Sequence, residues 1–285
     1  MGPVSSGLSI LYDTIRWEEK ALFDAAKEKG IDAKMVDCKN LSINLDKSPE
    51  DYGTVIQRCV SYYRSLHSTA ALEGKGVNVI NSLNTSIFAG NKLFTHMLLL
   101  KKGIPTPFSA VAFSQEAALE LLDKKGYPMV IKPTVGSWGR MIAMLKDREA
   151  AEAIIESRET MYPIYQVYYL EEFVNRPPRD IRAIVVGDKV VAAIYRYSGE
   201  AQWKTNMALG GRAEELKVTK ELEDICIKAK EAVYGQIVGV DLMESKENGL
   251  VVHEVNNTTE YKNTVRVTGV NIPAMMIDYV IQLRK

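Results

Sequence analysis

The sequence predicts an α/β fold of the α+β type, in which a small parallel domain is followed by two further domains. In residues 1–88, short apolar stretches alternate with helical stretches, a pattern typical of a parallel sheet covered by helices. Later in the chain, expected strands come in adjacent pairs joined by short polar turns, as in an antiparallel sheet. With 285 residues, 46% of them hydrophobic, the chain is long enough for two or three domains with buried cores.

Composition argues against several classes of function. The chain carries 36 basic and 36 acidic residues, so its net charge does not indicate a nucleic-acid partner. No apolar stretch reaches the length of a membrane span, and the first seven residues lack the basic and apolar regions of a secretory signal. Cys38, Cys59 and Cys226 are odd in number and lack CxxC spacing, which argues against a disulfide framework and a zinc site. We therefore expect a cytoplasmic protein that binds neither nucleic acid nor membrane.

The first domain is predicted from its alternating elements. Helices are expected at 17–29 and 62–72, and strands at 8–12, 33–37, 54–58 and 77–80. Ligand-facing residues of a parallel sheet lie at the carboxyl ends of its strands, which places Arg16, Arg58 and Ser61 near a cleft. For each arginine taken separately, a solvated surface charge is the alternative.

A domain boundary is expected where a long helix ends. The helix is predicted from Asn84 to Lys102, and the glycine and prolines of residues 103–107 end it. Beyond the boundary, 109–113 is a predicted strand and Ser114 caps a helix that extends to Lys125.

A glycine-containing loop joins the next two strands, 127–133 and 141–145. Its sequence, TVGSWGR, brings backbone N–H groups that can approach phosphate oxygens closely, and Lys132 adds positive charge at its root. The GxxxxGK[ST] spacing of a P-loop is absent, and many hairpins carry two glycines.

The following elements lead into a hairpin-rich second half. Asp147 is expected to start a helix that extends to Arg158, and a strand at 165–169 continues into Leu170–Val174. This last segment combines backbone acceptors with apolar side chains, which suits an adenine ring, although taken alone it is an ordinary strand. The rest of the chain, apart from one further hairpin, is predicted to contain a hairpin at 181–196, a helix at 219–233 and a helix capped by Asn271.

That further hairpin carries oxygen ligands. Asp241 lies in the predicted strand 238–243, and Glu254 and Asn256 lie on one side of the strand that starts at Leu250, because residues two apart in a strand point the same way. Two carboxylates and an amide oxygen suit Mg²⁺, which takes its other ligands from water and nucleotide phosphates. A solvated charge is the alternative for Glu254, but flanking valines indicate a half-buried sheet, where an unpaired carboxylate is costly. The pattern favours a nucleotide–metal site.

Several motifs occur in a specific order along nearly the whole chain. Lys92 follows a helix start, and KPxxGSWGR, EEFV, RDIR and KTN precede the aspartate and the Glu-x-Asn of the metal hairpin. This combination resembles the ATP-grasp ligases, and more closely their RimK-like branch. The resemblance implies an ATP-grasp fold with an N-terminal domain (1–88), a central domain (89–172, in which 89–107 is a linker helix packed on the C-terminal domain) and a C-terminal domain (173–285), the last two clamping ATP.

The resemblance also implies roles by position. It implies that the nucleotide is contacted by Lys92, Lys132, Gly136, Ser137, Trp138, Gly139, Glu171, Glu172, Phe173, Val174, Asp180, Lys204, Thr205 and Asn206. Within this set Glu171 to Val174 form the adenine hinge and Asp180 lies near the ribose. Catalysis falls to Lys132, Arg182, Arg196 and Asn206, and one or two Mg²⁺ ions are held by Asp241, Glu254 and Asn256.

A narrower resemblance, carried by residues 11–19, 58–61, 136–140 and 254–266, is to ligases that join α-aminoadipate to the C-terminal glutamate of the acidic carrier protein LysW. Residues expected near the amino acid are Arg16, Arg58, Asn257, Thr258, Asn263 and Arg266. The sequence Ala-Leu-Gly-Gly at 208–211 is more similar to the sister glutamate–LysW ligases, whereas 261–264 has the aminoadipate form, so aminoadipate, glutamate or both stay open. Homodimers or homotetramers are usual in this family. A ligase that adds glutamate to a protein tail and a non-catalytic ATP-binding regulator stay open as well.

Overall fold

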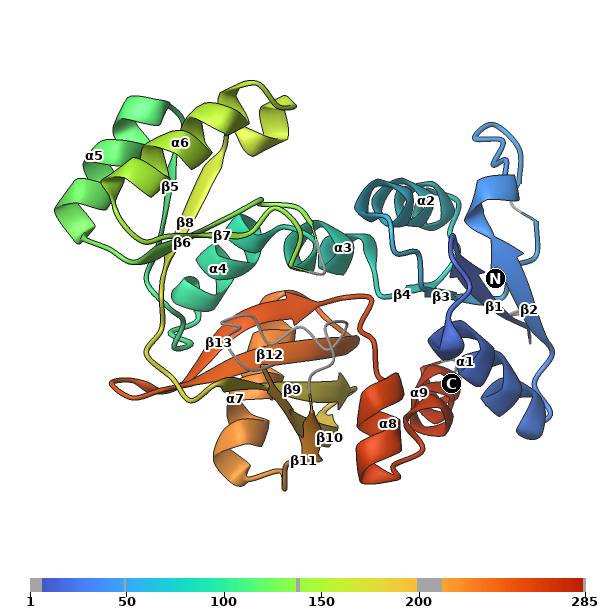
Figure 1. Ribbon diagram of the computed structural model, residues 1–285. Coiled ribbons are helices and arrows are strands. Elements are labelled where there is room, and N and C mark those ends of the chain that lie inside the picture. Colours follow the sequence, from blue (N-terminus) through green and yellow to red (C-terminus); the bar gives the residue numbers. More distant parts are fainter. Residues whose placement is uncertain (1–6, 49, 137–138, 199–211, 284–285) are drawn as a thin grey trace.

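Three sheets organise the computed structural model, which describes residues 7–48, 50–136, 139–198 and 212–283 (Figure 1). The N-terminal sheet has the order β2-β1-β3-β4 and all its pairs are parallel. Its strands are β1 (Leu8–Tyr12), β2 (Ala33–Asp37), β3 (Thr54–Gln57) and β4 (Val79–Ile80), and its helices are α1 (Trp17–Glu28), α2 (Tyr62–Gly74) and the 3₁₀ turn η1 (Cys38–Asn40). The predicted parallel N-terminal sheet is confirmed.

The long helix expected from Asn84 to Lys102 is instead two helices, α3 (Leu83–Ala89) and α4 (Lys92–Lys101). The break has a local cause, because the backbone of Asn91 is extended and its side chain accepts hydrogen bonds from the amides of Leu93 and Phe94. This is the capping that asparagine provides at a helix start. The break places Lys92 in the first turn of α4, where its side chain reaches the neighbouring sheet.

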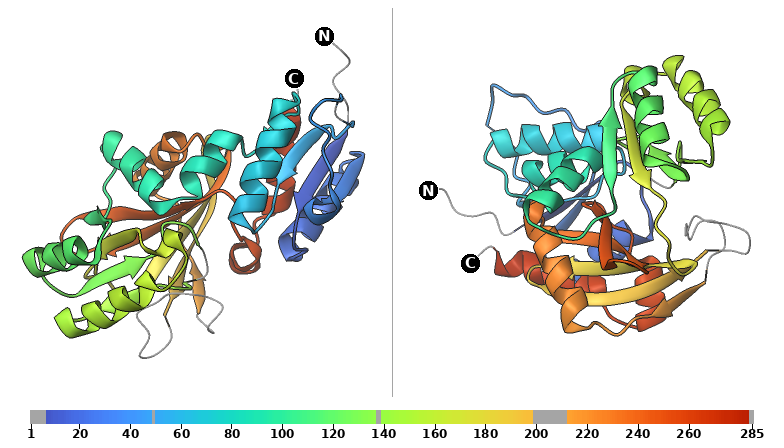
Figure 2. Two further views of the ribbon diagram at one scale, coloured as in Figure 1. Left: turned by 90° about the horizontal axis from the view of Figure 1, so that it is seen from above. Right: turned by 90° about the vertical axis from the view of Figure 1, so that its left-hand side faces the viewer.

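The central sheet is antiparallel, with the order β5-β8-β6-β7, and one face is covered by two helices. Its elements are β5 (Ser109–Ala112), α5 (Gln115–Lys125), β6 (Met129–Lys132), β7 (Ala143–Leu145), α6 (Arg148–Glu159), the 3₁₀ turn η2 (Pro163–Tyr165) and β8 (Tyr168–Glu172). Leu122 of α5 and Ile155 of α6 are buried against Ile131 and Leu170 of the sheet. Figure 1 and the left view of Figure 2 place α5 and α6 at the opposite end of the molecule from the N-terminal sheet.

The C-terminal sheet is the largest, with the order β11-β10-β9-β12-β13 and antiparallel pairing throughout. Its strands are β9 (Arg179–Val186), β10 (Lys189–Tyr197), β11 (Ala213–Glu215), β12 (Ile237–Ser245) and β13 (Gly249–Asn256). Helix α7 (Lys220–Ala232) covers one face together with Leu99 and Ile104 from the α4 region. On the other face, α9 (Ile272–Gln282) shares one core with α1 and β1, so the N-terminal and C-terminal domains pack as a unit. None of the helices in the described part of the chain is long and apolar enough to cross a membrane.

Gly239 of β12 allows the chain segment that follows β13 to lie directly on the sheet. A Cβ atom at this position would lie 2.1 Å from the Oγ1 atom of Thr259. Gly239→Ala is therefore expected to lower the free energy of unfolding by about 1–3 kcal/mol, as overpacking in a core does. Chemical denaturation measures the change. Gly74→Ala is the control, because nothing lies within 4 Å of a Cβ atom there, and equal stability of the two variants would contradict the expectation.

Candidate active site

The register of the C-terminal sheet lines up charged side chains from four strands. Arg182 of β9 lies opposite Asp241 of β12, and Asp241 lies opposite Glu254 of β13. On the other side of β9, Asp180 lies opposite Arg196 of β10. The predicted catalytic arginines and metal-binding carboxylates are therefore neighbours because of strand pairing alone.

Asp241 is the centre of this cluster. The Arg182 guanidinium forms a two-point ion pair with its carboxylate, and Arg196 Nη2 lies 3.1 Å from Asp241 Oδ2. Arg196 also pairs with Asp180 through contacts of 2.7 and 3.0 Å. Burial alone would raise the pKa of Asp241, but the two arginines outweigh burial and hold its pKa well below the usual range. Burial disfavours the Arg196 cation, yet Asp241 and Asp180 prevail and raise its pKa. Both side chains are ionised at neutral pH.

Lys92 connects the glycine loop to the predicted metal site. Its Nζ atom lies 3.1 Å from Glu254 Oε1 and donates a 2.7 Å hydrogen bond to the carbonyl of Gly136. Its backbone amide donates to the carbonyl of Thr134 at 2.8 Å. Burial alone would raise the pKa of Glu254, but Lys92 outweighs burial and lowers it. The start of α4 thus fixes the loop directly above β13.

Lys132, at the root of the loop, lies in a group of three side chains, of which Lys132 and Glu171 are buried and His253 is half-buried. Its ammonium forms an ion pair with Glu171, and the Nδ1 atom of His253 lies 3.3 Å from Lys132 Nζ and 3.2 Å from Glu171 Oε1. Burial alone would raise the pKa of Glu171, but Lys132 and His253 outweigh it and lower the pKa to about 2. Burial lowers the pKa of Lys132, against the opposing effect of Glu171. A positive charge is held at a defined point between the central and C-terminal sheets.

The sequence did not predict His253 as part of the site. Strict alternation along β13 would turn it away from Glu254. The strand contains a bulge, however: Asp241 pairs with Glu254 while Leu242 pairs with Val252, so His253 is an extra residue. A bulge re-aims side chains beside functional sites, and no residue type in this stretch marks its presence in advance.

Arg158 was also not predicted, and it holds the far end of the glycine loop. Its Nη2 atom donates a 2.6 Å hydrogen bond to the carbonyl of Met141, a residue with a φ of 58°. Only 2% of Arg158 is exposed, and its Nη1 atom has no hydrogen-bond partner among the described residues. Burial lowers its pKa. Two predicted nucleotide contacts in this loop, Ser137 and Trp138, and three in the later polar loop, Lys204, Thr205 and Asn206, lie outside the described residues.

The predicted adenine hinge begins at the end of β8. Glu171 is turned to Lys132, whereas the Glu172 carboxylate accepts a 2.8 Å hydrogen bond from the amide of Phe108. Phe173 is 39% exposed, and Val174 packs with Met243 and Val251.

Gly139, a further predicted nucleotide contact, lies in the glycine loop, in a turn, with a φ of 68°.

The residues expected near the amino acid fall into three groups. Arg16 and Arg58 both pair with the buried carboxylate of Glu19, at 2.7 and 3.0 Å, so their guanidinium groups hold structure together. Asn257 and Thr258 directly follow β13, and the carbonyl of Asn257 accepts a hydrogen bond from Asn81.

Asn263 and Arg266 lie on helix α8 (Lys262–Thr268). Arg266 is exposed, and its Nε atom lies 3.4 Å from Asn263 Oδ1.

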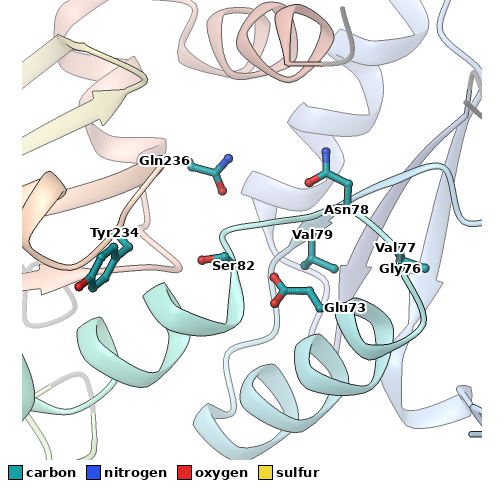
Figure 3. A pocket seen from close by; sticks show the side chains of 8 residues that line it. All are labelled: Glu73, Gly76, Val77, Asn78, Val79, Ser82, Tyr234 and Gln236. Carbon is teal, nitrogen blue, oxygen red and sulfur yellow. The ribbon is translucent and has the colours of Figure 1, made fainter.

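A separate cleft of about 480 Å³ lies at the junction of the N-terminal and C-terminal domains (Figure 3). Glu73, Asn78 and Ser82 line it from one side, and Tyr234 and Gln236 from the other. It contains none of the predicted site residues.

The chemistry of the donor set tests whether a divalent ion fits. Asp241 and Glu254 are both ionised and face each other across two strands, and Asn256 Nδ2 lies 3.4 Å from Asp241 Oδ2, which brings its amide group beside them. Mg²⁺ prefers such oxygen ligands, usually one or two carboxylates. Within the described residues no three His, Cys, Asp or Glu side chains gather as a metal site, so the candidate donor set here is two carboxylates and one amide. The residues fit magnesium better than zinc.

Lys92 of α4 and Lys132 of β6 lie beside a glycine loop, across from the paired carboxylates of an antiparallel sheet. This arrangement is the one expected of an ATP-grasp enzyme. Comparison with known proteins agrees. A RimK-like ATP-grasp domain model matches residues 89–280, and a LysX preATP-grasp domain model matches residues 8–87. The chain belongs to the RimK-like ATP-grasp family and is an ATP-dependent ligase.

Individual relatives are similar over nearly the whole chain. The α-aminoadipate–LysW ligase LysX of Sulfurisphaera tokodaii is 40% identical over 275 residues, which cover 95% of this chain and 96% of the relative. The glutamate–LysW ligase ArgX of the same organism is 33% identical, with coverages of 95% and 96%. Among solved structures, the RimK-domain ATP-grasp protein of Sphaerobacter thermophilus superimposes with a TM-score of 0.77 at 22% identity, over 96% of this chain and 99% of that one. The predicted ATP-grasp fold is confirmed.

Proposed function

We propose that this protein joins the α-amino group of α-aminoadipate to the γ-carboxylate of the C-terminal glutamate of the carrier protein LysW. One observation carries the proposal: 40% identity to an α-aminoadipate–LysW ligase extends over 95% of the chain, including residues 254–266 beside the metal site. The geometry supports it, because cations and metal-binding carboxylates gather where a phosphoryl group would be transferred.

The reaction needs activation because a carboxylate repels an attacking amine and oxide is a poor leaving group. The carrier's terminal γ-carboxylate attacks the γ-phosphate of ATP and gives an acyl phosphate and ADP. The α-amino group then attacks the acyl carbon, phosphate leaves, and the amine gives up a proton as the isopeptide bond forms. Such reactions depend on positioning and on charge stabilisation, with no covalent enzyme intermediate.

The chain supplies the positioned charges. Lys132 and Lys92, which flank the glycine loop, are proposed to contact the phosphates, and Arg182 and Arg196, which pair with Asp241, are proposed to contact the transferring group. Asp241, Glu254 and Asn256 would hold one or two magnesium ions, which neutralise charge that develops on phosphate oxygens. Lys92 pairs with Glu254 in this structure. When a metal-bound nucleotide binds, this ion pair would break: Lys92 would then contact a phosphate, and Glu254 would contact the metal.

The amino acid is proposed to lie between the metal site and α8. Arg266 is exposed and close to Asn263, so its guanidinium is the candidate for pairing with a substrate carboxylate. Asn257 and Thr258 follow the proposed metal ligand Asn256 directly and would border the same space.

ADP release by the purified protein tests the proposal, with ATP, magnesium, LysW and either α-aminoadipate or glutamate as the amine. ADP release that requires LysW and aminoadipate is expected. Equal or better turnover with glutamate would instead favour the second candidate, a glutamate–LysW or bifunctional ligase, which the 33% identity to ArgX supports. No ADP release with LysW and either amino acid would overturn both and point to another acceptor, such as a different protein tail.

Arg158→Met is expected to raise the KM for ATP by about tenfold, since it removes a charged hydrogen bond that holds the nucleotide loop at Met141. The free energy of unfolding should change by less than about 1 kcal/mol, because a buried guanidinium without a carboxylate partner contributes little net stability. Steady-state kinetics and denaturation measure the two effects.

In the double variant Arg158→Met/Met141→Gly, the KM for ATP should fall part of the way back to the wild-type value, because glycine adopts a positive φ without strain. Arg148→Met, at an exposed position on the same helix, is the control. An unchanged KM for ATP in Arg158→Met would contradict the assignment.

A further inference from the structure

The segment between the metal site and α8 is held mainly by the N-terminal domain. Residues 257–261 leave β13 directly after Asn256 and lead into α8, which carries Asn263 and Arg266. The segment therefore joins the proposed metal ligands to the residues proposed for the amino acid. Its conformation decides where those two groups of residues stand relative to each other.

Glu18 of α1 holds the end of this segment. Its Oε1 atom accepts hydrogen bonds from the amides of Tyr261 and Lys262, at 3.2 and 3.0 Å. Its backbone carbonyl accepts a third bond, 3.0 Å long, from the Tyr261 hydroxyl. Glu18 is 4% exposed and Tyr261 is 1% exposed. A buried carboxylate of the N-terminal domain thus accepts hydrogen bonds from the backbone of the C-terminal domain.

The bonds matter because α8 has no cap of its own. Tyr261 occupies the N-cap position, and its side chain makes no capping hydrogen bond. Helix starts leave amide groups unpaired, and an N-cap side chain or a nearby carboxylate normally satisfies them. For α8 the carboxylate comes from Glu18, which lies 243 residues away in sequence from Tyr261. The first turn of α8 depends on the N-terminal domain.

Two further contacts hold the middle of the segment. Arg58, itself paired with Glu19, donates a 3.0 Å hydrogen bond to the carbonyl of Thr259. From the opposite side, Arg182 Nη1 lies 3.4 Å from Thr259 Oγ1 and from the carbonyl of Glu260. The segment therefore lies between a buried ion pair of the N-terminal domain and a proposed catalytic arginine.

We propose that Glu18 is a positioning residue for amino-acid selection, which it controls by fixing the first turn of α8 and not by touching the substrate. The proposal rests on the proposed function, since it assigns the substrate side of that same site. Arg58 acts in the same way on Thr259, which replaces its expected contact with a substrate carboxylate. The N-terminal domain thereby determines which amino acid the C-terminal domain accepts.

Glu18→Ala tests the proposal in the full-length protein, with KM measured separately for the amino acid and for ATP. The KM for α-aminoadipate should rise about tenfold, as loss of a charged hydrogen bond implies. The KM for ATP should change less than about twofold, because the hydrogen bonds of Glu18 go to Tyr261 and Lys262, which are not proposed nucleotide contacts. The preference for aminoadipate over glutamate in kcat/KM should shift by about the same factor.

Matched variants separate positioning from a general loss of structure. Glu18→Gln keeps an Oε1 acceptor for both amides and should retain nearly wild-type constants, whereas Asp24→Ala, at an exposed position on the same helix, should change nothing. If Glu18→Ala does not fold, Tyr261→Phe removes the hydroxyl bond to Glu18 and should raise the amino-acid KM by itself.

Three outcomes would overturn the inference. The first is that Glu18→Ala leaves the KM for the amino acid and the preference for aminoadipate over glutamate unchanged, which would show that the contact does not act on the substrate. If Glu18→Ala does not fold, the same result in Tyr261→Phe would show this. A fall in kcat alone would show that the contact is merely structural. Wild-type protein that does not turn over LysW with either amino acid would overturn the proposed function, and the inference with it.

Discussion

Lys132→Ala is expected to lower kcat for ADP release on the order of 10²–10³-fold, the loss typical of removing one preorganised charge that faces a transition state. The ammonium lies at the root of the glycine loop, fixed by Glu171 and by His253 at 3.3 Å. Because these partners hold it before substrate arrives, stabilising the phosphoryl group needs no reorganisation. Stopped assays of ADP formation at saturating ATP measure the effect.

The interpretation depends on separating chemistry from folding. Lys132→Ala leaves the buried Glu171 carboxylate without its cation, and breaking a buried pair in this way can cost about 3–5 kcal/mol. The double variant Lys132→Ala/Glu171→Gln removes that unpaired charge and should recover stability in thermal unfolding while its turnover stays low. Lys230→Ala is the matched control, since Lys230 is also buried and pairs with Asp188, but on α7 outside the site. Wild-type turnover in Lys132→Ala would contradict the assignment of Lys132.

The sequence predicted the parts of the site that follow from strand pairing. Asp241 and Glu254 lie on adjacent strands of a hairpin, and polar residues after apolar stretches mark such strand positions in the sequence. The same alternation predicted the parallel N-terminal sheet and the hairpin that carries Arg182 and Arg196. Local periodicity was sufficient for these elements because each depends on neighbours close in sequence.

What the sequence could not predict depends on tertiary contacts. His253 enters the site through a bulge, and Glu18 meets Tyr261 across 243 residues. The break between α3 and α4 is different in kind: it was missed although its cause is local, because the Asn91 side chain accepts hydrogen bonds from the amides of Leu93 and Phe94 and so caps α4. Arg58 was expected at a substrate for its charge, and its pairing with Glu19 of α1, 39 residues away in sequence, becomes visible only once the N-terminal domain is folded.

Asp241→Asn is expected to lower kcat for ADP release on the order of 10²–10³-fold, as Lys132→Ala does. It is also expected to raise the magnesium concentration needed for half-maximal rate. The carboxylate has two roles in the proposed mechanism: it is a metal ligand, and it orients Arg182 and Arg196 through ion pairs. Asparagine keeps the shape but loses the charge, so the metal is bound less tightly and both arginines lose a partner. The two effects reinforce each other because one side chain connects them.

A magnesium titration of the ATP-dependent rate distinguishes these roles. Glu244→Gln is the control, because Glu244 lies on the same strand and pairs with Arg179 at 2.7 Å, yet it is no member of the proposed site. A raised magnesium requirement in Asp241→Asn alone supports a direct ligand. A lower kcat with an unchanged magnesium requirement would mean that Asp241 acts only by orienting the arginines, and that Glu254 and Asn256 carry the metal. The pairing that keeps Asp241 ionised before metal arrives would then be its whole contribution to catalysis.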